Sequence, residues 1–374
     1  MSVGMSASEV RAHLDGFCMR TERAGRFFGD AMPDYYDVAT GRWLMNGGWT
    51  EGFWPGLLWR LHLHSPNAGL AEQARRATRW VARVKADVDD HDLGFLFEPS
   101  CVLEHEATGN VEMLPAALAA AERLAARYLP AGHYIPAHGA LDGPQAGFAI
   151  IDTVMNLPLL LWAARHTGDK RFADIATETA RTIAREHIRP GGSSCQVLWL
   201  DPATGRTVKR EAIMAVNVDS CWARGQAWGM LGFARLHQLT GEIGFKQVAE
   251  KLAGYFLSRV PSDGVVFHDL DDPTAPDVPK DTSAQAIAAG GLVTLAQCTP
   301  GKESVRWRTS AEQLLKPLLD HHLVPENPSD AAPRGLLGHG CKSLRKNQGV
   351  VSEIIFGDYY FVDALTRWLR LGSG

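Results

Sequence analysis

The sequence predicts an all-α fold, an (α/α)6 barrel of six helical hairpins with a small β-hairpin at its rim. Three observations lead to this fold. Some segments are apolar almost all round, other segments are amphipathic, and the two kinds alternate about six times along the 374 residues. A helix that is apolar on every side must be buried, and an amphipathic helix covers it. Units repeated at this spacing predict a solenoid or a closed array.

The inner helices are expected where a polar or aromatic residue opens a run of small and apolar residues about four helical turns long. Three of these segments end in a Thr-Gly turn, which stops a helix. The expected inner segments are 49–62, 92–110, 151–169, 221–242, 281–298 and 352–370.

The outer helices are expected where apolar residues recur every three to four positions. These segments are 71–84, 113–128, 172–187, 245–257 and 311–323, and segment 6–24 would complete the ring. An open superhelix of helix pairs is the alternative architecture. The glycine and aromatic content of the inner segments favours closure around a tight centre, so we expect a single domain over residues 1–374.

The rim is predicted from the connections. Between the third and fourth units, in segment 191–213, β-forming residues flank the turn sequence DPATG, which predicts a small hairpin. The loops 132–147 and 271–283 are rich in glycine and proline and are expected to shape the same rim.

Composition excludes several classes of protein. A net charge of −4 without clustered Lys or Arg argues against a nucleic-acid partner. No apolar run reaches the roughly 18–20 residues that span a membrane, and residues 1–17 lack a signal-peptide pattern. Six scattered cysteines without a CxxC pair indicate free thiols and a cytoplasmic location. Nucleotide-binding, HExxH and GxSxG motifs are absent, so we expect no cofactor and no metal.

Two aspartates are the candidate catalytic groups. Asp92 begins the second inner segment and Asp152 the third, so they lie one repeat apart. Because inner helices of such a barrel run parallel, their starts gather at one mouth. Aromatic residues fall near the starts of the other inner segments, namely Trp49, Trp222, Trp228, Tyr359 and Tyr360. The sequence therefore predicts a pocket with two carboxylates on one wall and aromatic rings around them.

That combination suits carbohydrate chemistry. Aromatic faces stack on sugar rings, and two carboxyl groups can divide acid and base duties. Two close carboxylates repel, so one keeps its proton at neutral pH. Desolvation by the tryptophans acts in the same direction, whereas a helix N-terminus opposes it by favouring the anion.

Simpler interpretations of the same residues remain open. An aspartate at a helix start is most often an N-cap. The run DVDDHD at 87–92 could hold calcium, although it lacks the glycine and the distal glutamate of the twelve-residue calcium loop.

Six motifs together resemble the unsaturated glucuronyl hydrolases of glycoside hydrolase family 88. They are WTEGFWPGLLW, HDLGFLFEPS, IDTVMNLPLLLWAA, WARGQAWGM, DTSAQAIAA and GDYYFVDAL, and they occur in the family's order over nearly the whole chain. The resemblance implies an (α/α)6 barrel. It also implies hydrolysis of oligosaccharides whose non-reducing end is a 4,5-unsaturated uronic acid, by protonation of C4 and addition of water at C5.

The resemblance also implies roles for individual residues. Asp152 matches the general acid/base, and Asp92 matches a second carboxylate that holds sugar hydroxyls and supports positive charge. The substrate-binding positions implied are Trp49, His91, Trp222, Arg224, Gln226 and Trp228. Arg224 would counter the substrate carboxylate or orient the pocket, and a structural salt bridge is the alternative.

The binding shell departs from the family pattern at several positions. Gln196 stands where members often have histidine, and Met214 where they often have glutamine. In the run from Ser343 to Gly349, Lys346 replaces a serine and Gln348 a lysine of the pattern found in members that act on sulfated glycosaminoglycans. We therefore expect glycosaminoglycan fragments not to be preferred. Ser343 and Lys346 remain candidate contacts to an acidic leaving sugar, and a solvated basic loop is the alternative.

Three other functions compete with this one. The related unsaturated rhamnogalacturonyl hydrolases share the barrel and the chemistry, but the HDLGF motif favours the glucuronyl group. Sugar 2-epimerases are also α/α barrels, and they rely on histidines. A non-catalytic helical-repeat binder would need no paired buried carboxylates.

Overall fold

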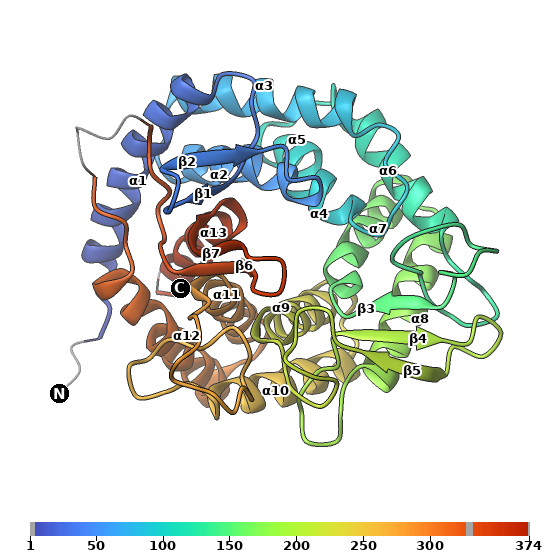
Figure 1. The fold of residues 1–374 in the computed structure, drawn as a ribbon. Coiled ribbons are helices and arrows are strands. Elements are labelled where there is room, and N and C mark those ends of the chain that lie inside the picture. The colour runs from blue at the N-terminus through green and yellow to red at the C-terminus, as the bar shows by residue number, and fades with distance from the viewer. Residues whose placement is uncertain (1–3, 327–331, 373–374) are drawn as a thin grey trace.

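The computed structural model describes residues 4–326 and 332–372; of the predicted domain 1–374, residues 1–3, 327–331 and 373–374 lie outside this part. Within it, six inner positions form a ring (Figure 1). They are filled by α2 (Phe53–His64), a composite of α4 (Leu93–Phe97), the wide turn η2 (Glu98–Val102) and α5 (Leu103–Thr108), then α7 (Thr153–Thr167), α9 (Ala223–Thr240), α11 (Thr282–Cys298) and α13 (Ile355–Leu371). Each position contacts the next, and α13 contacts α2. The predicted closed barrel is confirmed.

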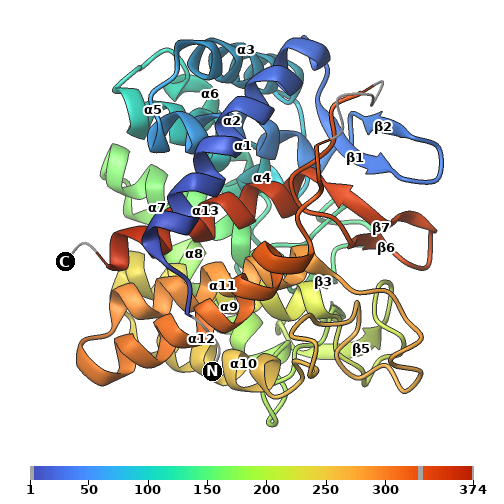
Figure 2. The same ribbon diagram turned by 90° about the vertical axis from the view of Figure 1, so that its left-hand side faces the viewer.

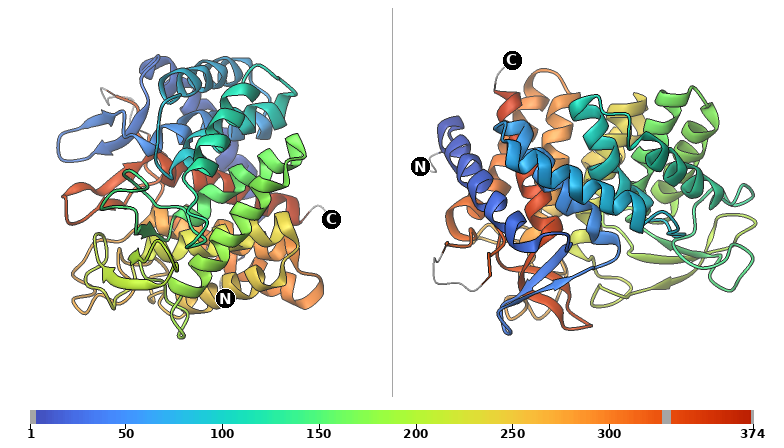
Figure 3. Two further views of the ribbon diagram at one scale, coloured as in Figure 1. Left: turned by 90° about the vertical axis from the view of Figure 1, so that its right-hand side faces the viewer. Right: turned by 90° about the horizontal axis from the view of Figure 1, so that it is seen from above.

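An outer layer of amphipathic helices surrounds this ring (Figures 1 and 3). It consists of α1 (Ala7–Phe28), α3 (Ala68–Val84), α6 (Leu114–Ala126), α8 (Lys170–Glu186), α10 (Ile243–Leu257) and α12 (Gly301–His321). The first of these, α1, contacts α2, α3 and α13. It buries Val10, Leu14 and Phe17 there, so the N-terminal segment completes the ring as the sequence predicts.

The predicted Thr-Gly turns end three inner helices. Gly109, Gly168 and Gly241 have φ values of 72°, 78° and 75°. Glycine adopts this left-handed backbone without the steric penalty of a Cβ atom. The preceding threonine hydroxyl donates to the carbonyl four residues earlier in each case. The chain therefore leaves each helix at a defined residue and turns back into the outer layer.

The structure contains more β-structure than the sequence predicted. The expected hairpin is present as β4 (Val197–Leu200) and β5 (Thr207–Glu211), and β3 (Phe148–Ile150) extends it to an antiparallel sheet of order β3-β4-β5. A second antiparallel sheet, of order β2-β1-β7-β6, was not predicted. It is formed by β1 (Pro33–Asp37), β2 (Arg42–Met45), β6 (Gly340–Ser343) and β7 (Gln348–Ile354). The predicted hairpin is thus confirmed, and the five further strands of the described residues add β-structure that was not predicted from the sequence.

Both sheets lie at one end of the barrel, where the inner helices begin. Figure 2 shows the strands together at this end and the C-terminus at the other, and both views of Figure 3 agree. We call the two ends the sheet end and the far end. Among the described helices, none is long and apolar enough to cross a membrane.

Candidate active site

Asp92 and Asp152 meet at the sheet end. Asp92 directly precedes α4 and Asp152 directly precedes α7. A Cβ atom on Gly94 would lie 2.4 Å from Cα of Asn156, so only glycine allows the two helix starts to approach this closely. The backbone N–H of Phe95 donates to Oδ1 of Asn156 at 2.8 Å, which fixes the contact. The predicted pairing of successive repeats therefore holds for these two helix starts.

His91 lies between the two carboxyl groups. Its Nε2 is 3.4 Å from Oδ1 of Asp92 and 3.8 Å from Oδ1 of Asp152, and its Nδ1 is 2.7 Å from the Thr153 hydroxyl. Burial, together with the charges of His138 and Arg127, lowers the pKa of His91 well below its ordinary value. The imidazole is therefore neutral at pH 7 and leaves the charge of the pair uncancelled.

Burial raises the pKa of both carboxyl groups. The pKa of Asp92 is raised well above its ordinary value by burial and by the charges of Asp152 and Asp90, while a hydrogen bond from Asn156 opposes the shift. Burial raises the pKa of Asp152 to about 7, against the opposing effects of backbone N–H groups and of Arg224. Because the two groups interact, the protons leave the pair in two steps that belong to both. The pair retains a proton in the acid range and near neutrality.

Neither aspartate is a simple N-cap. No side-chain capping hydrogen bond is formed by Asp92 or by Asp152. Oδ1 of Asp152 is buried without any hydrogen-bond partner among the described residues. An unpaired buried carboxylate oxygen is costly, which indicates a role other than helix stability. Across residues 4–326 and 332–372, no group of three or more His, Cys, Asp or Glu side chains is arranged to hold a metal ion.

The aromatic residues predicted around the pair divide into two groups. Trp49 is half-buried and stacks on Phe356, with ring centroids 5.2 Å apart, and it also contacts Phe95 at 5.3 Å. Trp222 is 5% exposed, whereas Trp228 is fully buried beneath Phe95. Trp49 is thus the ring of this set with an open face at the sheet end.

Tyr359 and Tyr360 lie deeper than this aromatic wall, where the Tyr360 ring contacts Trp228 with ring centroids 5.1 Å apart. Both line a cavity among the later turns of the inner helices. The sequence placed them correctly near the start of α13, but they follow Ile355 by a full helical turn and point into the barrel interior. Their expected place beside the carboxylates is therefore wrong.

Arg224 holds secondary structure together at this end of the barrel. It is 1% exposed and bonds Oδ2 of Asp281 at 3.0 Å. Nη1 also donates to the carbonyl oxygen of Cys341 and Nη2 to that of Lys342, both at 2.6 Å, while Nε is buried without a hydrogen-bond partner among the described residues. The guanidinium also lies over the Trp222 ring at 4.6 Å. The geometry therefore matches the structural salt bridge rather than an arginine open to a substrate carboxylate.

The side-chain amide of Gln226 also forms its hydrogen bonds within the protein. Its side-chain oxygen accepts from the N–H of Ser194, and its nitrogen donates to the carbonyls of Gly192 and Leu252. It is completely buried. The amide ties the segment before β4 to α10 and reaches no open surface.

Several residues that differ from the family pattern, or lie next to such positions, contact segment 212–216. The oxygen of Gln196 accepts from the backbone N–H groups of Ile213, Met214 and Ala215 at 2.6–3.3 Å. The Ser343 hydroxyl contacts the Met214 sulfur at 3.5 Å. Arg345 donates to two carbonyls of the same segment. Lys346 is exposed in the turn between β6 and β7.

Two residues of the site were not singled out from the sequence. Asn156 bonds both aspartate-bearing segments, and Phe356 lies beneath Trp49 and Arg224. Asn156 lies four positions after Asp152, one turn along the same helix, and this spacing could have found it. Phe356 carries no comparable signal, because its neighbours come from distant parts of the chain.

Comparison with known proteins identifies the family. No family model matches the chain. It is 33% identical to the unsaturated chondroitin disaccharide hydrolase of Streptococcus pneumoniae over 331 residues, which cover 87% of this chain and 83% of that protein. It is 32% identical to the unsaturated glucuronyl hydrolase of a Bacillus species over 366 residues, 95% of each chain. The chain belongs to the unsaturated glucuronyl hydrolases.

Solved structures of unsaturated glucuronyl hydrolases agree with this assignment. The enzyme from the Bacillus species superimposes with a TM-score of 0.89 at 31% identity, covering 96% of both chains. The enzyme from Streptococcus agalactiae gives 0.91 at 29% identity, covering 98% of this chain and 94% of that one. An aspartate-to-asparagine mutant of the latter is complexed with dGlcA-GalNAc6S and gives 0.83 at 28% identity. The unsaturated glucuronyl hydrolase fold thus extends over this entire barrel.

Proposed function

We propose that this glycoside hydrolase acts on oligosaccharides whose non-reducing end is a 4,5-unsaturated uronic acid. The observation that carries the proposal is the pair Asp92 and Asp152 in a chain of this family. The pKa values of both carboxyl groups are raised, and the two groups lie on either side of a neutral His91. Protonation of carbon needs a neutral acid near pH 7, and burial supplies one here. The family's complex with dGlcA-GalNAc6S supports the substrate class.

The reaction consumes one water and needs no cofactor. The Asp152 carboxyl group gives its proton to C4, the C4=C5 double bond is lost, and positive charge develops at C5 and the ring oxygen. Water adds at C5 and returns a proton to the Asp152 carboxylate. The hemiketal that forms opens and releases the leaving sugar. A pKa of about 7 suits a group that must first donate and then accept a proton.

Asp92 acts as the second carboxyl group of this reaction. Both carboxyl groups face His91 Nε2, at 3.4 Å and 3.8 Å, and the charge of Asp152 contributes to the raised pKa of Asp92. In this position it holds hydroxyl groups of the unsaturated sugar and supports the positive charge at C5. The half-buried Trp49 offers a stacking face beside the pair.

The leaving sugar is proposed to be unsulfated or only weakly sulfated. The Ser343 hydroxyl is turned to the Met214 sulfur, and Arg345 is engaged with segment 212–216. Arg345 and Lys346 are both exposed in the β6–β7 turn, but only Lys346 forms no ion pair or side-chain hydrogen bond among the described residues. One exposed lysine is a weak, strongly screened anchor for a sulfate group.

An ultraviolet assay tests the proposal directly. Unsaturated disaccharides released by lyases from pectin, hyaluronan, chondroitin, heparin, gellan and ulvan carry a conjugated C=C–COO⁻ band. A hydrolase of this kind erases that band, and unsulfated substrates are expected to react faster than their sulfated counterparts. A band that persists with every substrate, as an epimerase or a sugar-binding protein would leave it, contradicts the proposed reaction.

The proposed location is the cytoplasm. All six cysteines are free, and five of them are buried. Thiols persist unpaired in reducing compartments. Fractionation of the source cells, followed by immunodetection, would refute this location if the protein were recovered with the secreted fraction.

A further inference from the structure

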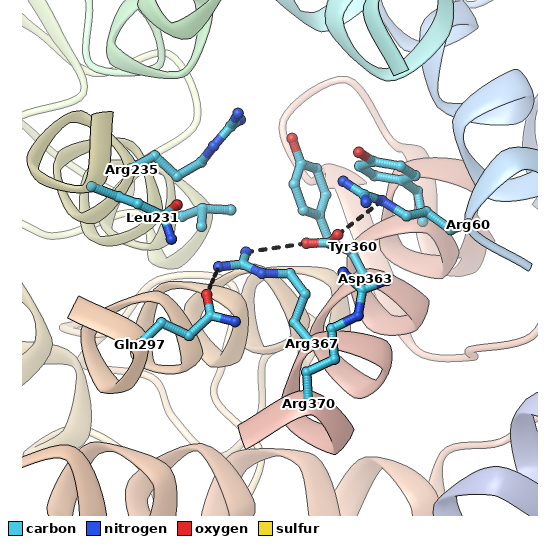
Figure 4. Close-up of a pocket in the computed structure, with 10 residues that line it drawn as sticks. Arg60, Leu231, Arg235, Gln297, Tyr360, Asp363, Arg367 and Arg370 are labelled. Carbon is cyan, nitrogen blue, oxygen red and sulfur yellow. Dashed lines mark hydrogen bonds and ion pairs between the residues drawn. The ribbon is translucent and has the colours of Figure 1, made fainter. Parts of the chain in front are cut away.

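A cavity of about 280 Å³ lies near the far end of the barrel, on the inner faces of α9, α11 and α13 (Figure 4). Its lining includes four arginines, Arg60, Arg235, Arg367 and Arg370, together with the rings of Tyr359 and Tyr360. A second cavity of about 420 Å³ also has Arg60 and Arg370 in its lining, so the two adjoin. Arg367 follows the start of α13 by 12 residues, roughly 18 Å along the helix from the sheet end.

The cavity holds more positive charge than its carboxylates neutralise. Asp363 is shared between Arg60, at 3.0 Å, and Arg367, at 3.4 Å (Figure 4). Arg235 pairs with Glu98, at 2.9 Å. Four guanidinium groups thus face two carboxylates. Among the described residues, no ion pair is formed by Arg370.

The end of α13 accounts for Arg370 alone and does not explain the whole cluster. Arginines can offset the partial negative charge at a helix C-terminus by bonding its last carbonyls. Arg370 lies in the last turn of α13, but Arg367 bonds side chains instead: it donates to Thr294 at 2.6 Å and to Gln297 at 2.8 Å, besides its ion pair. Side chains in a helix lean toward its N-terminus, which directs the half-buried Arg367 into the barrel, and the exposed Arg370 reaches the lining of the same cavity. The surplus charge therefore faces the cavity.

We propose that this far-end cavity binds a small oxyanion, such as phosphate, sulfate or a carboxylate, between Arg235, Arg367 and Arg370. The planar guanidinium fork matches two oxygens of such a group at once. A cavity with partly buried guanidinium groups strengthens that attraction relative to open solvent. The site is separate from the carboxylate pair and goes beyond the proposed hydrolysis.

Thermal unfolding at constant ionic strength tests the site. Sodium phosphate, sodium sulfate and sodium acetate are each compared with sodium chloride at pH 7. At about a hundredfold excess over Kd, a bound anion is expected to raise the Tm of a chain of this length by about 3 °C. A greater effect of phosphate and sulfate than of acetate assigns the site to tetrahedral oxyanions, and an equal effect of acetate assigns it to carboxylates.

Two substitutions of the exposed Arg370 locate the effect. Arg370→Glu is expected to abolish the rise, and Arg370→Gln to weaken phosphate affinity at least fivefold in titration calorimetry. Arg206→Glu makes the same charge change in the exposed β4–β5 turn and is expected to keep the full rise. Asp152→Asn is also expected to keep it. An equal rise in chloride, or a phosphate effect that survives Arg370→Glu, overturns the proposal.

Discussion

Asp152 is the residue on which the proposed reaction depends most directly. Replacing it with asparagine keeps the shape of the side chain but removes the transferable proton. We expect Asp152→Asn to lower turnover of an unsaturated disaccharide by roughly a hundredfold to ten-thousandfold, the usual contribution of a general acid or base. The rate of loss of the ultraviolet band measures the effect, and far-ultraviolet circular dichroism checks that the helices are retained.

The matched control is Asp142→Asn. Asp142 lies exposed in a rim loop, so the same chemical change there removes a carboxylate that touches no part of the pair. Its turnover is expected to equal that of the unchanged protein. If Asp152→Asn turned over substrate at the control's rate, Asp152 would not be the acid.

The same carboxyl group makes stability depend on pH. Its folded pKa, about 7, lies above its unfolded value, so its contribution to the free energy of unfolding is fully present below about pH 4 and is lost as the pH rises through 7. Asp152→Asn mimics the neutral form at every pH. The substitution is therefore expected to raise Tm at pH 8 and to leave it nearly unchanged at pH 4.

The comparison between the two proteins reports on the coupled pair, because removing the Asp152 charge also removes one cause of the raised pKa of Asp92. Burial also raises the pKa of Asp358 to about 7, but Asp358 is present in both proteins and cancels in the difference. Calorimetric scans at pH 4, 6 and 8 suffice. A Tm difference that stays constant across these pH values would show that Asp152 titrates normally in the folded state.

For single residues, the sequence predicts where a side chain lies in the fold better than it predicts which side chain it contacts. The pairing of Asp92 with Asp152 followed from their spacing by one repeat. The partner of Arg224 did not, because Asp281 lies at the start of another inner helix and nothing local marks the two as opposite charges in contact. Motif resemblance placed Arg224 at the site, and only the fold distinguishes a residue that builds the site from one that contacts substrate.

The ion pair of Arg224 with Asp281 joins three elements. Asp281 caps α11 through the N–H groups of Ser283 and Ala284, and Arg224 connects it from α9 to β6. Both side chains are almost fully buried. Arg224→Met would leave the Asp281 carboxylate buried without its cation. We expect the free energy of unfolding to fall by about 3–5 kcal/mol, measured by urea titration.

A double substitution tests whether the loss comes from this pair. In Arg224→Met/Asp281→Asn, no buried charge is left unpaired, so the combined loss is expected to be smaller than the sum of the two single losses. Additive losses would place the effect elsewhere. A variant Arg224→Met with unchanged stability and a raised KM would instead return Arg224 to the role of a substrate contact.

Elements differ in how strongly the sequence announces them. The inner helices are buried all round and the outer ones along one face, so both kinds carry a long periodic pattern. Strand β1 is five residues long and almost wholly buried, which hides the alternation that marks a strand. Strand β7 includes Gly349 and Val351, which have positive φ, and it leads directly into α13. Its sequence is therefore interpreted as the start of the inner helix and not as a strand.

At the scale of the whole molecule, closure decides the architecture. Repeat patterns predict stacked helical hairpins, but they do not say whether the first hairpin meets the last. Here α13 packs against α2, and α1 packs against both. The same closure collects the helix starts at the sheet end and the arginines near the far end, so one fold presents two chemically opposite regions.

The proposed single domain makes a prediction about cooperativity. Leu14 lies on α1 and is fully buried at the seam where the ring closes. Leu14→Ala is expected to cost roughly 3 kcal/mol. If residues 1–374 unfold as one unit, the slowest-exchanging amides of α9, on the opposite side of the ring, lose the same protection as those of α1. Native-state hydrogen exchange measures both, with the exposed Val111→Ala as the neutral control. In an array of independent hairpins, by contrast, only α1 and its neighbours would lose protection.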